Sequence, residues 1–415
     1  MPLLACSSGS PAAQPPTVDS GVLKLSLPDA GSHADAAKDV TAEAGFDAAV
    51  CTSPDASTSL SCGTLAFAAS PVTSRPRNHH VTLLANTGAG PMLYAIGGFD
   101  GQTGDYANVD RVPLAQDGSL GTWVSDTPIP FPTGGMVGEV VTGTVVVAGG
   151  TGITEVYDQA YSAVIQSDGS LSAWQSAGTV GEPRMHAASI VQGSTMWVLG
   201  GFDNQSVWSD IVSAKVTNGT VAAWAPAGQL PGPMSHFTAT LVGDYVYLTG
   251  GLSQSAFNNP PELTNTWRGQ IQTDGTLGGW TAMLPLPVGE ATHAAFYYGG
   301  YLNVCGGINN VPAQEDRCWQ SPIGPDHSLG TFEEISSLPI ARGHVHQMPI
   351  FGTHVYSIAG AIDFNLDSTT EIDVGVFGTT EVMKKSMRTH ESSPSPLLHH
   401  GSVCHGGIKR EIVED

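Results

Sequence analysis

A short motif that returns at a nearly constant interval is the feature that most restricts how this chain can fold. Its five copies end in an aromatic residue, at Trp123, Trp174, Trp224, Trp280 and Phe332. The steps between these aromatic residues are 51, 50, 56 and 52 residues. A period of this size is typical of solenoids, propellers and repeat arrays. We therefore expect one large repeat domain rather than several unrelated domains.

Each repeat contains four segments that look like short β-strands. In one repeat a small-residue segment, 186–191, leads through a tight turn into an apolar segment that ends at Gly200-Gly201. A third segment, 209–214, precedes the turn motif, and a fourth carries the tryptophan. Similar pairs occur at Gly97-Gly98, Gly149-Gly150, Gly250-Gly251 and Gly306-Gly307, with Ala359-Gly360 as a degenerate sixth. Short strands joined by hairpin turns predict one four-stranded sheet per repeat.

These features together resemble the kelch repeat, in which a strand ends in Gly-Gly, an aromatic residue follows, and an Arg opens the next strand. The resemblance covers about residues 60–377 and rests on five or six imperfect copies. It implies a β-propeller, with one four-stranded sheet per repeat around a central channel. The chain is similar in this respect to bacterial exported kelch proteins of the lipoprotein type.

Spacing predicts how many blades there are and how the ring closes. The terminal aromatic residue precedes the next first strand by twelve positions in four repeats, while Trp280 precedes His293 by thirteen. Counting back twelve from His79 reaches Phe67, which lies in a cryptic copy of the motif. The sixth repeat has no such motif after its third strand. We predict an all-β, six-bladed kelch-type β-propeller in which residues 62–70 form the outer strand of blade six.

The two ends of the chain differ from the repeats in composition. Residues 1–6 resemble a residual lipobox with Cys6 as the lipidation site, although only five residues precede it. Residues 7–59 are rich in Ala, Asp, Ser and Pro and are expected to form a flexible linker. Residues 378–415 are expected to be a disordered tail. We expect an exported protein, held by a lipid anchor in the periplasm, at the outer membrane or at the cell surface.

The cysteines fit an exported protein if Cys51 pairs with Cys62 and Cys305 pairs with Cys318. This pairing leaves Cys6 for the lipid and Cys404 unpaired in the tail. Spacing does not prove connectivity, and buried free thiols are the alternative.

Charge and hydropathy exclude some partners. The chain has 37 acidic and 15 basic residues, a formal net charge of -22, which argues against nucleic acid or an anionic membrane surface as the main partner. No apolar run approaches the roughly 20 residues that span a bilayer. We expect a monomer without a transmembrane segment and without a cofactor.

Candidate binding residues gather at one end of the predicted channel. Arg-x-His triplets occur at Arg77 and His79, Arg184 and His186, and Arg342 and His344, and His236 keeps the histidine in a fourth blade. The functional interpretation is an anion pocket that grips a carboxylate or sulfate. The structural alternative, which the sequence favours, is that each Arg hydrogen-bonds loop carbonyls of neighbouring blades. No metal site is predicted, because residues placed one per blade rarely converge on one ion.

The sequence favours recognition over catalysis. Long, variable loops fall on the face that holds the two-to-three and four-to-one connections, and a protein or glycan ligand is expected there. One alternative is a sugar-active enzyme such as a mutarotase of acidic sugars, with Glu290 or His293 moving the proton. Convergence of Glu290 with the three Arg residues would support the enzyme, and a closed channel would support the binding protein. The other alternative is a structural envelope protein.

Overall fold

The computed structural model describes residues 50–52, 59–61, 65–70, 73, 75–101, 104, 106–254, 261–309, 314–363 and 365–378. All regular secondary structure in this part is β-strand, with no helix. It therefore has no helix long and apolar enough to cross a membrane. Cys6, Cys62, Cys404 and nearly all of the predicted linker and tail lie outside the described residues.

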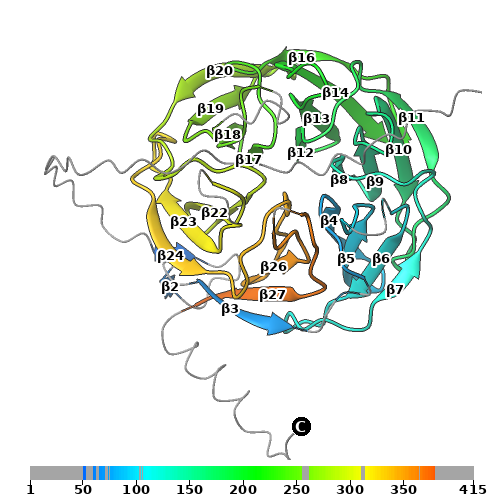
Figure 1. The fold of residues 1–415 in the computed structure, drawn as a ribbon, viewed down its shortest axis with the longest axis horizontal. Helices are drawn as coiled ribbons and strands as arrows, with labels where there is room; N and C mark the ends of the chain where they lie inside the picture. The colour runs from blue at the N-terminus through cyan, green and yellow to red at the C-terminus, as the bar shows by residue number, and fades with distance from the viewer. Residues whose placement is uncertain are drawn as a thin grey trace, which may run out of the picture.

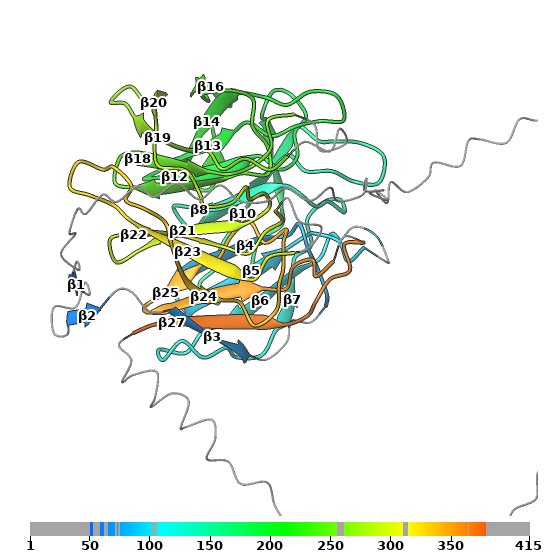
Figure 2. The ribbon, with the colours of Figure 1, turned by 60° about the vertical axis from the view of Figure 1, so that its left-hand side comes forward.

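Antiparallel sheets follow one another around a common centre, as Figure 1 shows along the axis and Figure 2 at an angle. Four of these sheets have four strands each. Their strands are β4 (Val81–Thr87), β5 (Gly90–Ile96), β6 (Val109–Pro113) and β7 (Val124–Asp126); β8 (Val137–Val141), β9 (Thr144–Ala148), β10 (Gln159–Val164) and β11 (Gln175–Thr179); β21 (Ala294–Tyr298), β22 (Tyr301–Cys305), β23 (Arg317–Pro322) and β24 (Glu333–Ser337); and β25 (Ile350–Phe351), β26 (His354–Ile358), β27 (Ile372–Phe377) and β3 (Leu65–Ser70).

The remaining part of the ring is a single nine-stranded sheet. It contains β12 (Ala188–Gln192), β13 (Thr195–Leu199), β14 (Asp210–Thr217), β15 (Thr220–Val221), β16 (Ala225–Gln229), β17 (Thr238–Val242), β18 (Tyr245–Thr249), β19 (Thr266–Ile271) and β20 (Leu277–Ala282). A separate short pair, β1 (Val50–Thr52) and β2 (Ser59–Ser61), completes the strands.

The expectation of six separate sheets is therefore corrected to four separate sheets and one shared sheet. The two four-strand runs of the shared sheet meet where β16 pairs in parallel with β20, at Gly228 and Leu277. A Cβ added to Gly228 would lie 2.1 Å from the Leu277 carbonyl oxygen. The absence of a side chain at Gly228 is what lets the two outer strands touch.

The chain ends meet in the sheet that contains β25, β26 and β27. Strand β3 pairs with β27 over six residues, from Leu65 opposite Phe377 to Ser70 opposite Ile372. This is the position expected for a closing strand, over the part of 62–70 that the structure describes. An early segment thus supplies the outer strand of the last repeat.

Hydrogen bonds between consecutive repeats form a closed series of six. In each, the second residue of the glycine pair donates its amide to a carbonyl just before the next first strand. The bonds run from Gly98 to Thr133, Gly150 to Arg184, Gly201 to Met234, Gly251 to Glu290, Gly307 to Arg342 and Gly360 to Arg77, at 2.7 to 2.9 Å. The first residue of each pair has a φ between 53° and 67°. Five of these six residues are Gly, and Ala359 is the one that has a side chain. The glycine pairs are therefore joints between repeats.

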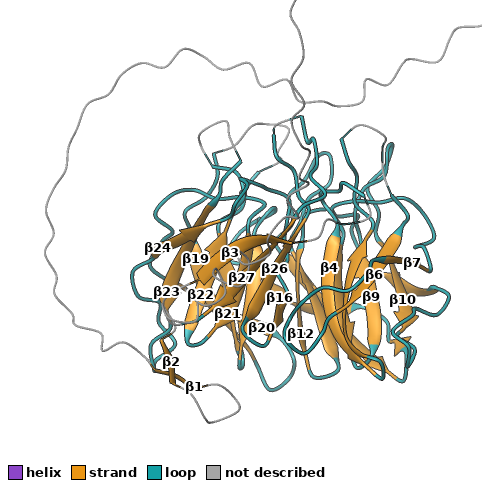
Figure 3. Cartoon of the chain, turned by 90° about the horizontal axis from the view of Figure 1, so that it is seen from below, coloured by secondary structure: helices purple, strands orange, loops and turns teal. Residues whose placement is uncertain are grey.

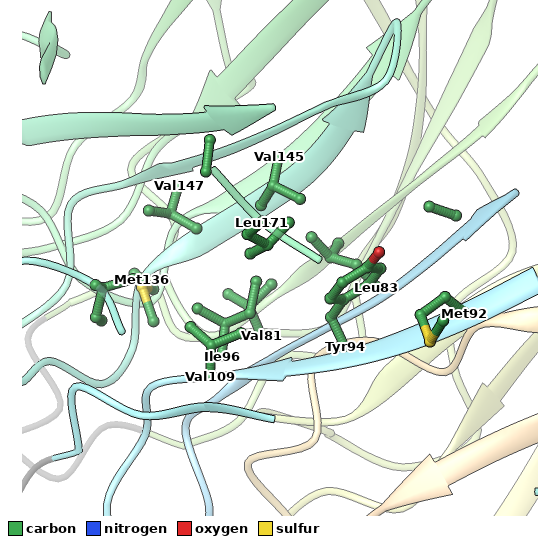
Figure 4. Close-up of a cluster of buried hydrophobic side chains, with 13 residues drawn as sticks. Val81, Leu83, Met92, Tyr94, Ile96, Val109, Met136, Val145, Val147 and Leu171 are labelled. Atoms are coloured by element: carbon green, nitrogen blue, oxygen red, sulfur yellow. The ribbon is translucent and has the colours of Figure 1, made fainter. Parts of the chain in front are cut away.

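The aromatic residue of the motif packs against the preceding repeat. The indole Nε1 atoms of Trp174, Trp224 and Trp280 donate to the carbonyls of Thr127, Ala177 and Gln229, respectively. Apolar clusters fill the space between adjacent sheets, and Figure 4 shows the one that joins Leu83 and Tyr94 to Val145, Val147 and Leu171. The core is thus divided into layers between sheets, which holds the ring together.

Candidate functional site

Six residues with left-handed backbone form a ring around the axis, which we call the axial ring. They are His79, Gly135, His186, His236, Thr292 and His344, with φ between 50° and 65°. Five backbone hydrogen bonds of 2.8 to 3.1 Å connect consecutive members from His344 round to Thr292. Positive φ is uncommon for residues with a side chain. The position predicted from the sequence was therefore wrong by one residue in the fifth repeat, where Thr292 and not His293 takes the ring position.

The three predicted anion-binding Arg residues form ion pairs inside their own repeats. Arg77, Arg184 and Arg342 are at most 1% exposed. Their guanidinium groups pair with carboxylates on the third strands, those of Asp110, Asp210 and Asp373 respectively. The Arg184 pair measures 2.8 Å between Nη2 and Oδ2, and the Arg342 pair 2.5 Å.

Each of these guanidinium groups also donates to carbonyls beside the glycine pair of the same repeat. Arg77 Nη1 reaches Ala95 O and Gly97 O, Arg184 Nη1 reaches Gly200 O, and Arg342 Nη1 reaches Ala359 O. The predicted anion pocket is thus corrected, because these donors already have anionic and carbonyl acceptors. The structural alternative is corrected as well, since the carbonyls belong to the same repeat and not to a neighbour.

Glu290 and His293, the candidate catalytic residues, are buried in the fifth repeat. His293 is fully buried, and its Nε2 lies 3.0 Å from Thr238 Oγ1 and 2.9 Å from Thr249 Oγ1. Burial lowers the pKa of His293 to about 3. Glu290 is 1% exposed, and no donor among the described residues reaches its Oε2. Both side chains are therefore buried within the fold.

The buried carboxyl of Glu290 predicts a pH-dependent loss of stability. Burial, and then the nearby charge of Glu315, raise its pKa from 4.5 to about 9. A group with a raised folded-state pKa contributes stability that is complete below the unfolded-state pKa and is lost as the pH rises through the folded-state value. Glu290→Gln removes this proton uptake. The variant should be more stable than the wild type by roughly 3 kcal/mol at pH 7, because each pKa unit corresponds to about 1.4 kcal/mol.

Urea unfolding of both proteins between pH 4.5 and 9 measures this effect. The stability difference should grow with pH across this window. Glu333→Gln, which neutralises an exposed carboxylate on β24, is the control and should leave the profile unchanged. Parallel profiles for the wild type and Glu290→Gln would show that the buried carboxyl does not take up a proton on folding.

Histidine side chains from the axial ring gather at the axis. The rings of His79 and His344 are stacked with centroids 3.8 Å apart, and those of His186 and His236 with centroids 3.9 Å apart. A ligand nitrogen from each of His79, His186 and His344 lies within 4.8 Å of the other two. The expectation that histidines placed one per blade stay apart is therefore wrong for these three residues.

Burial keeps these imidazoles neutral. Desolvation first, and then the neighbouring histidines, hold the pKa values of His79, His186 and His344 well below the usual 6.5. Burial lowers the pKa of His346, which follows the ring, to about 4. His346 Nε2 lies 3.4 Å from His186 Nδ1, so it extends the cluster along the channel.

A cavity of about 330 Å³ lies in the channel beside the axial ring. Its lining includes His186 of the ring and first-strand residues of several repeats. The polar side chains that line it are His80, Thr82, Glu139, His186, Ser189, Thr238, His346 and Gln347. Most of these residues were not predicted, because small and polar residues on a first strand do not stand out in the sequence. The Arg-x-His-x-His pattern at 342–346 was the one available signal.

Two polar side chains form hydrogen bonds between repeats at the channel. Glu139 on β8 accepts a 2.8 Å hydrogen bond from Ser189 Oγ on β12, and burial raises its pKa to about 7. Gln347 accepts from the Thr82 amide and donates to the Gly138 carbonyl. The two Gln347 bonds satisfy backbone groups on the inner strands β4 and β8, as buried backbone polar groups require.

The structure places one of the two predicted cysteine pairs. Cys305 on β22 and Cys318 on β23 are directly opposite each other and joined by a disulfide. Cys51 lies on β1, while Cys62, its predicted partner, lies outside the described residues. The Cys305–Cys318 bond ties the second and third strands of the fifth repeat together.

The catalytic and anion-binding sets predicted from sequence therefore do not converge. The Arg residues are confined to their own repeats, and the ring histidines close around the axis.

Comparisons with known proteins give the fold and no more. No protein-family model matches the sequence, and no curated protein matches it. Among 545 matching chains of solved structures is one titled "Structure of YjhT", with a TM-score of 0.58 and 13% identity over 74% of this chain and 96% of that chain. YjhT is a kelch-type β-propeller. The chain therefore has a β-propeller fold similar to that of YjhT.

Proposed function

We propose that this protein is a non-catalytic recognition propeller that binds a protein on its loop face, the face with the two-to-three and four-to-one connections. Figure 3 shows long loops on one side of the ring and short turns on the other. The observation that carries the proposal is that the three Arg residues at the channel mouth are paired with carboxylates, whereas Ile153, Leu284 and Ile362 are exposed in loops on this face. In keeping with the sequence, we place the protein in the bacterial cell envelope with a lipid anchor.

We count this ring as six kelch-type blades, taking the nine-stranded sheet as two. The closed series of six hydrogen bonds between glycine pairs and the next repeats supports this count. The six positions of the axial ring support it independently, since each comes from one repeat. On this count the Gly228 contact joins the outer strands of blades three and four.

Exposed aliphatic side chains mark the loop face as a contact surface. Ile153 is 84% exposed in the loop that follows β9, and Leu284 and Ile362 are also exposed in loops on this face. They are spread around the ring, which suits a broad protein surface better than one small ligand. Ile153 is the most exposed of the large apolar side chains that the structure describes, so it is the first candidate for a contact.

The charge on this face favours a basic partner. Every described Arg near it is paired with a carboxylate, namely Arg75, Arg77, Arg184, Arg317 and Arg342. Exposed carboxylates such as Glu155, Glu182 and Asp316 remain. An acidic surface steers a cationic partner toward it and repels an anionic one.

Binding of the full chain to arrays of glycans and of envelope proteins tests this function. We expect saturable binding to a basic protein, weakened at least about tenfold by Ile153→Ser with Leu284→Ser, because apolar contacts are lost. Val164→Ser, at the exposed end of β10 on the opposite face, should have no effect. Binding to glycans alone would favour glycan recognition. The absence of any saturable ligand would overturn the proposal and favour the structural envelope protein.

A further inference from the structure

We propose that His79, His186 and His344 form a transition-metal site on the axis, with Zn²⁺ as the ion and a fourth position open to water or an anion. This goes beyond the proposed recognition function and does not depend on it. The three side chains come from three repeats, yet their ligand nitrogens lie within 4.8 Å of one another.

The backbone brings these side chains together at a conformational cost. His79, His186 and His344 have φ values of 55°, 50° and 55°. Left-handed backbone is unfavourable for residues with a Cβ and persists where the surroundings impose it. The hydrogen bonds of the axial ring hold this backbone in place. At Gly135 the ring carries no side chain, and His186 Nε2 lies 3.3 Å from where a Cβ would be.

Hydrogen bonding leaves a lone pair of His79 available to an ion. Asn78 Nδ2 donates to Leu366 O at 2.8 Å and lies 2.7 Å from Ser368 Oγ, which orients the amide so that Asn78 Oδ1 faces His79 Nδ1. Nδ1 must therefore carry the proton, and Nε2 the lone pair. A second interaction that fixes the tautomer is characteristic of metal-binding histidines.

His344 supplies an independent indication of a missing ligand. It is more than nine-tenths buried, and its Nδ1 has no hydrogen-bond partner among the described residues. A buried nitrogen without a partner is unfavourable unless something else satisfies it. An ion on the axis would satisfy it.

The donor set decides the class of metal. Three imidazoles without a carboxylate or thiolate suit Zn²⁺, Cu²⁺ or Ni²⁺ rather than Ca²⁺ or Mg²⁺. Three protein ligands leave one position open in a tetrahedral zinc site. Zinc-nitrogen bonds of about 2.0 to 2.1 Å require nitrogens about 3.4 Å apart, so the rings must close by about 1.4 Å at most. The rings of His79 and His344 are stacked with an interplanar angle of 22°, so ion binding also requires one of these two rings to turn until both lone pairs point at the ion.

Equilibrium dialysis of the chelator-treated full chain against ZnCl₂ tests the site. We expect one tightly bound Zn²⁺ per chain, and at least a tenfold loss of affinity in His186→Asn and in His344→Asn. Asn is chosen because it tolerates positive φ. His236→Asn is the matched control, because His236 is a buried ring residue with φ of 56° that is not one of the three proposed ligands. Equal losses in all three variants would overturn the assignment.

A second comparison separates this site from histidines elsewhere in the chain. Replacing His399, His400, Cys404 and His405 together should leave zinc binding unchanged, and loss of binding in that variant would overturn the proposal. If the ring variants do not fold, the site is tested by anomalous diffraction at the zinc absorption edge from crystals of the zinc-loaded wild-type protein. A peak on the axis beside His79, His186 and His344 supports the site, whereas a peak elsewhere or none overturns it.

Discussion

Arg342→Met is expected to destabilise the protein by about 3 to 5 kcal/mol, because it leaves a buried carboxylate without its partner. The side chains of Arg342 and Asp373 are both 0% exposed. Burial raises the pKa of Asp373 to about 6 even with the guanidinium 2.5 Å away, so the charged form depends on Arg342. Urea unfolding at pH 7.5 measures the loss. The loss should shrink at pH 5, where Asp373 can be protonated.

Two further variants separate the buried charge from the lost packing. Arg342→Met with Asp373→Asn should recover more than half of the loss, because no uncompensated charge remains. Arg184→Met should cost less, about 1 to 2 kcal/mol, because Asp210 is one-third exposed and keeps part of its hydration. A double variant as unstable as Arg342→Met alone would show that the ion pair is not the source of the effect.

Deletion of residues 1–70 is expected to lower the melting temperature by on the order of 10 °C, since it removes β3 from the ring. Strand β27 would lose its six-residue partner and become an open edge. Leu65, which is 3% exposed, and Phe67 pack in the apolar cluster with Phe296 and Phe377, and this packing would be lost as well. Thermal unfolding followed by circular dichroism measures the change.

Deletion of residues 1–49 is the control, because it leaves all the described strands in place. It should leave the melting temperature within a degree or two. A peptide of residues 62–72, added to the shortened protein, should restore part of the lost stability, and a scrambled peptide should not. An unchanged melting temperature after removal of residues 1–70 would show that β3 does not hold the ring closed.

Local sequence was sufficient to predict the repeat unit. The turn before each aromatic residue depends on neighbours alone: the carboxylates of Asp117, Asp168 and Asp274 accept bonds from residues two positions later, and a Gly at positive φ lies between. The glycine pairs are likewise local, since their left-handed backbone admits few other residues. Counting back from His79 by the spacing of this unit predicted that residues 62–70 lie at the outer edge of the ring.

The candidate site was less predictable, because its properties depend on distant residues. The Arg-x-His triplets were visible, but the partners that neutralise the Arg residues lie 26 to 33 positions later on the third strands. The ring position of Thr292 was missed because His293 was chosen by its residue type, although Thr292 keeps the twelve-residue spacing from Trp280. Glu139 and Gln347 had no local signal at all, since only the ring brings their strands to the same channel.

The sequence by itself therefore determined the repeat, its turns and its closing strand, because strand length, turn chemistry and spacing are encoded within about 50 residues. Only the tertiary structure decided which charges are satisfied, where two sheets merge at Gly228, and which histidines meet on the axis. Those outcomes depend on distances between repeats, which arise when the ring closes and are not present in any single repeat.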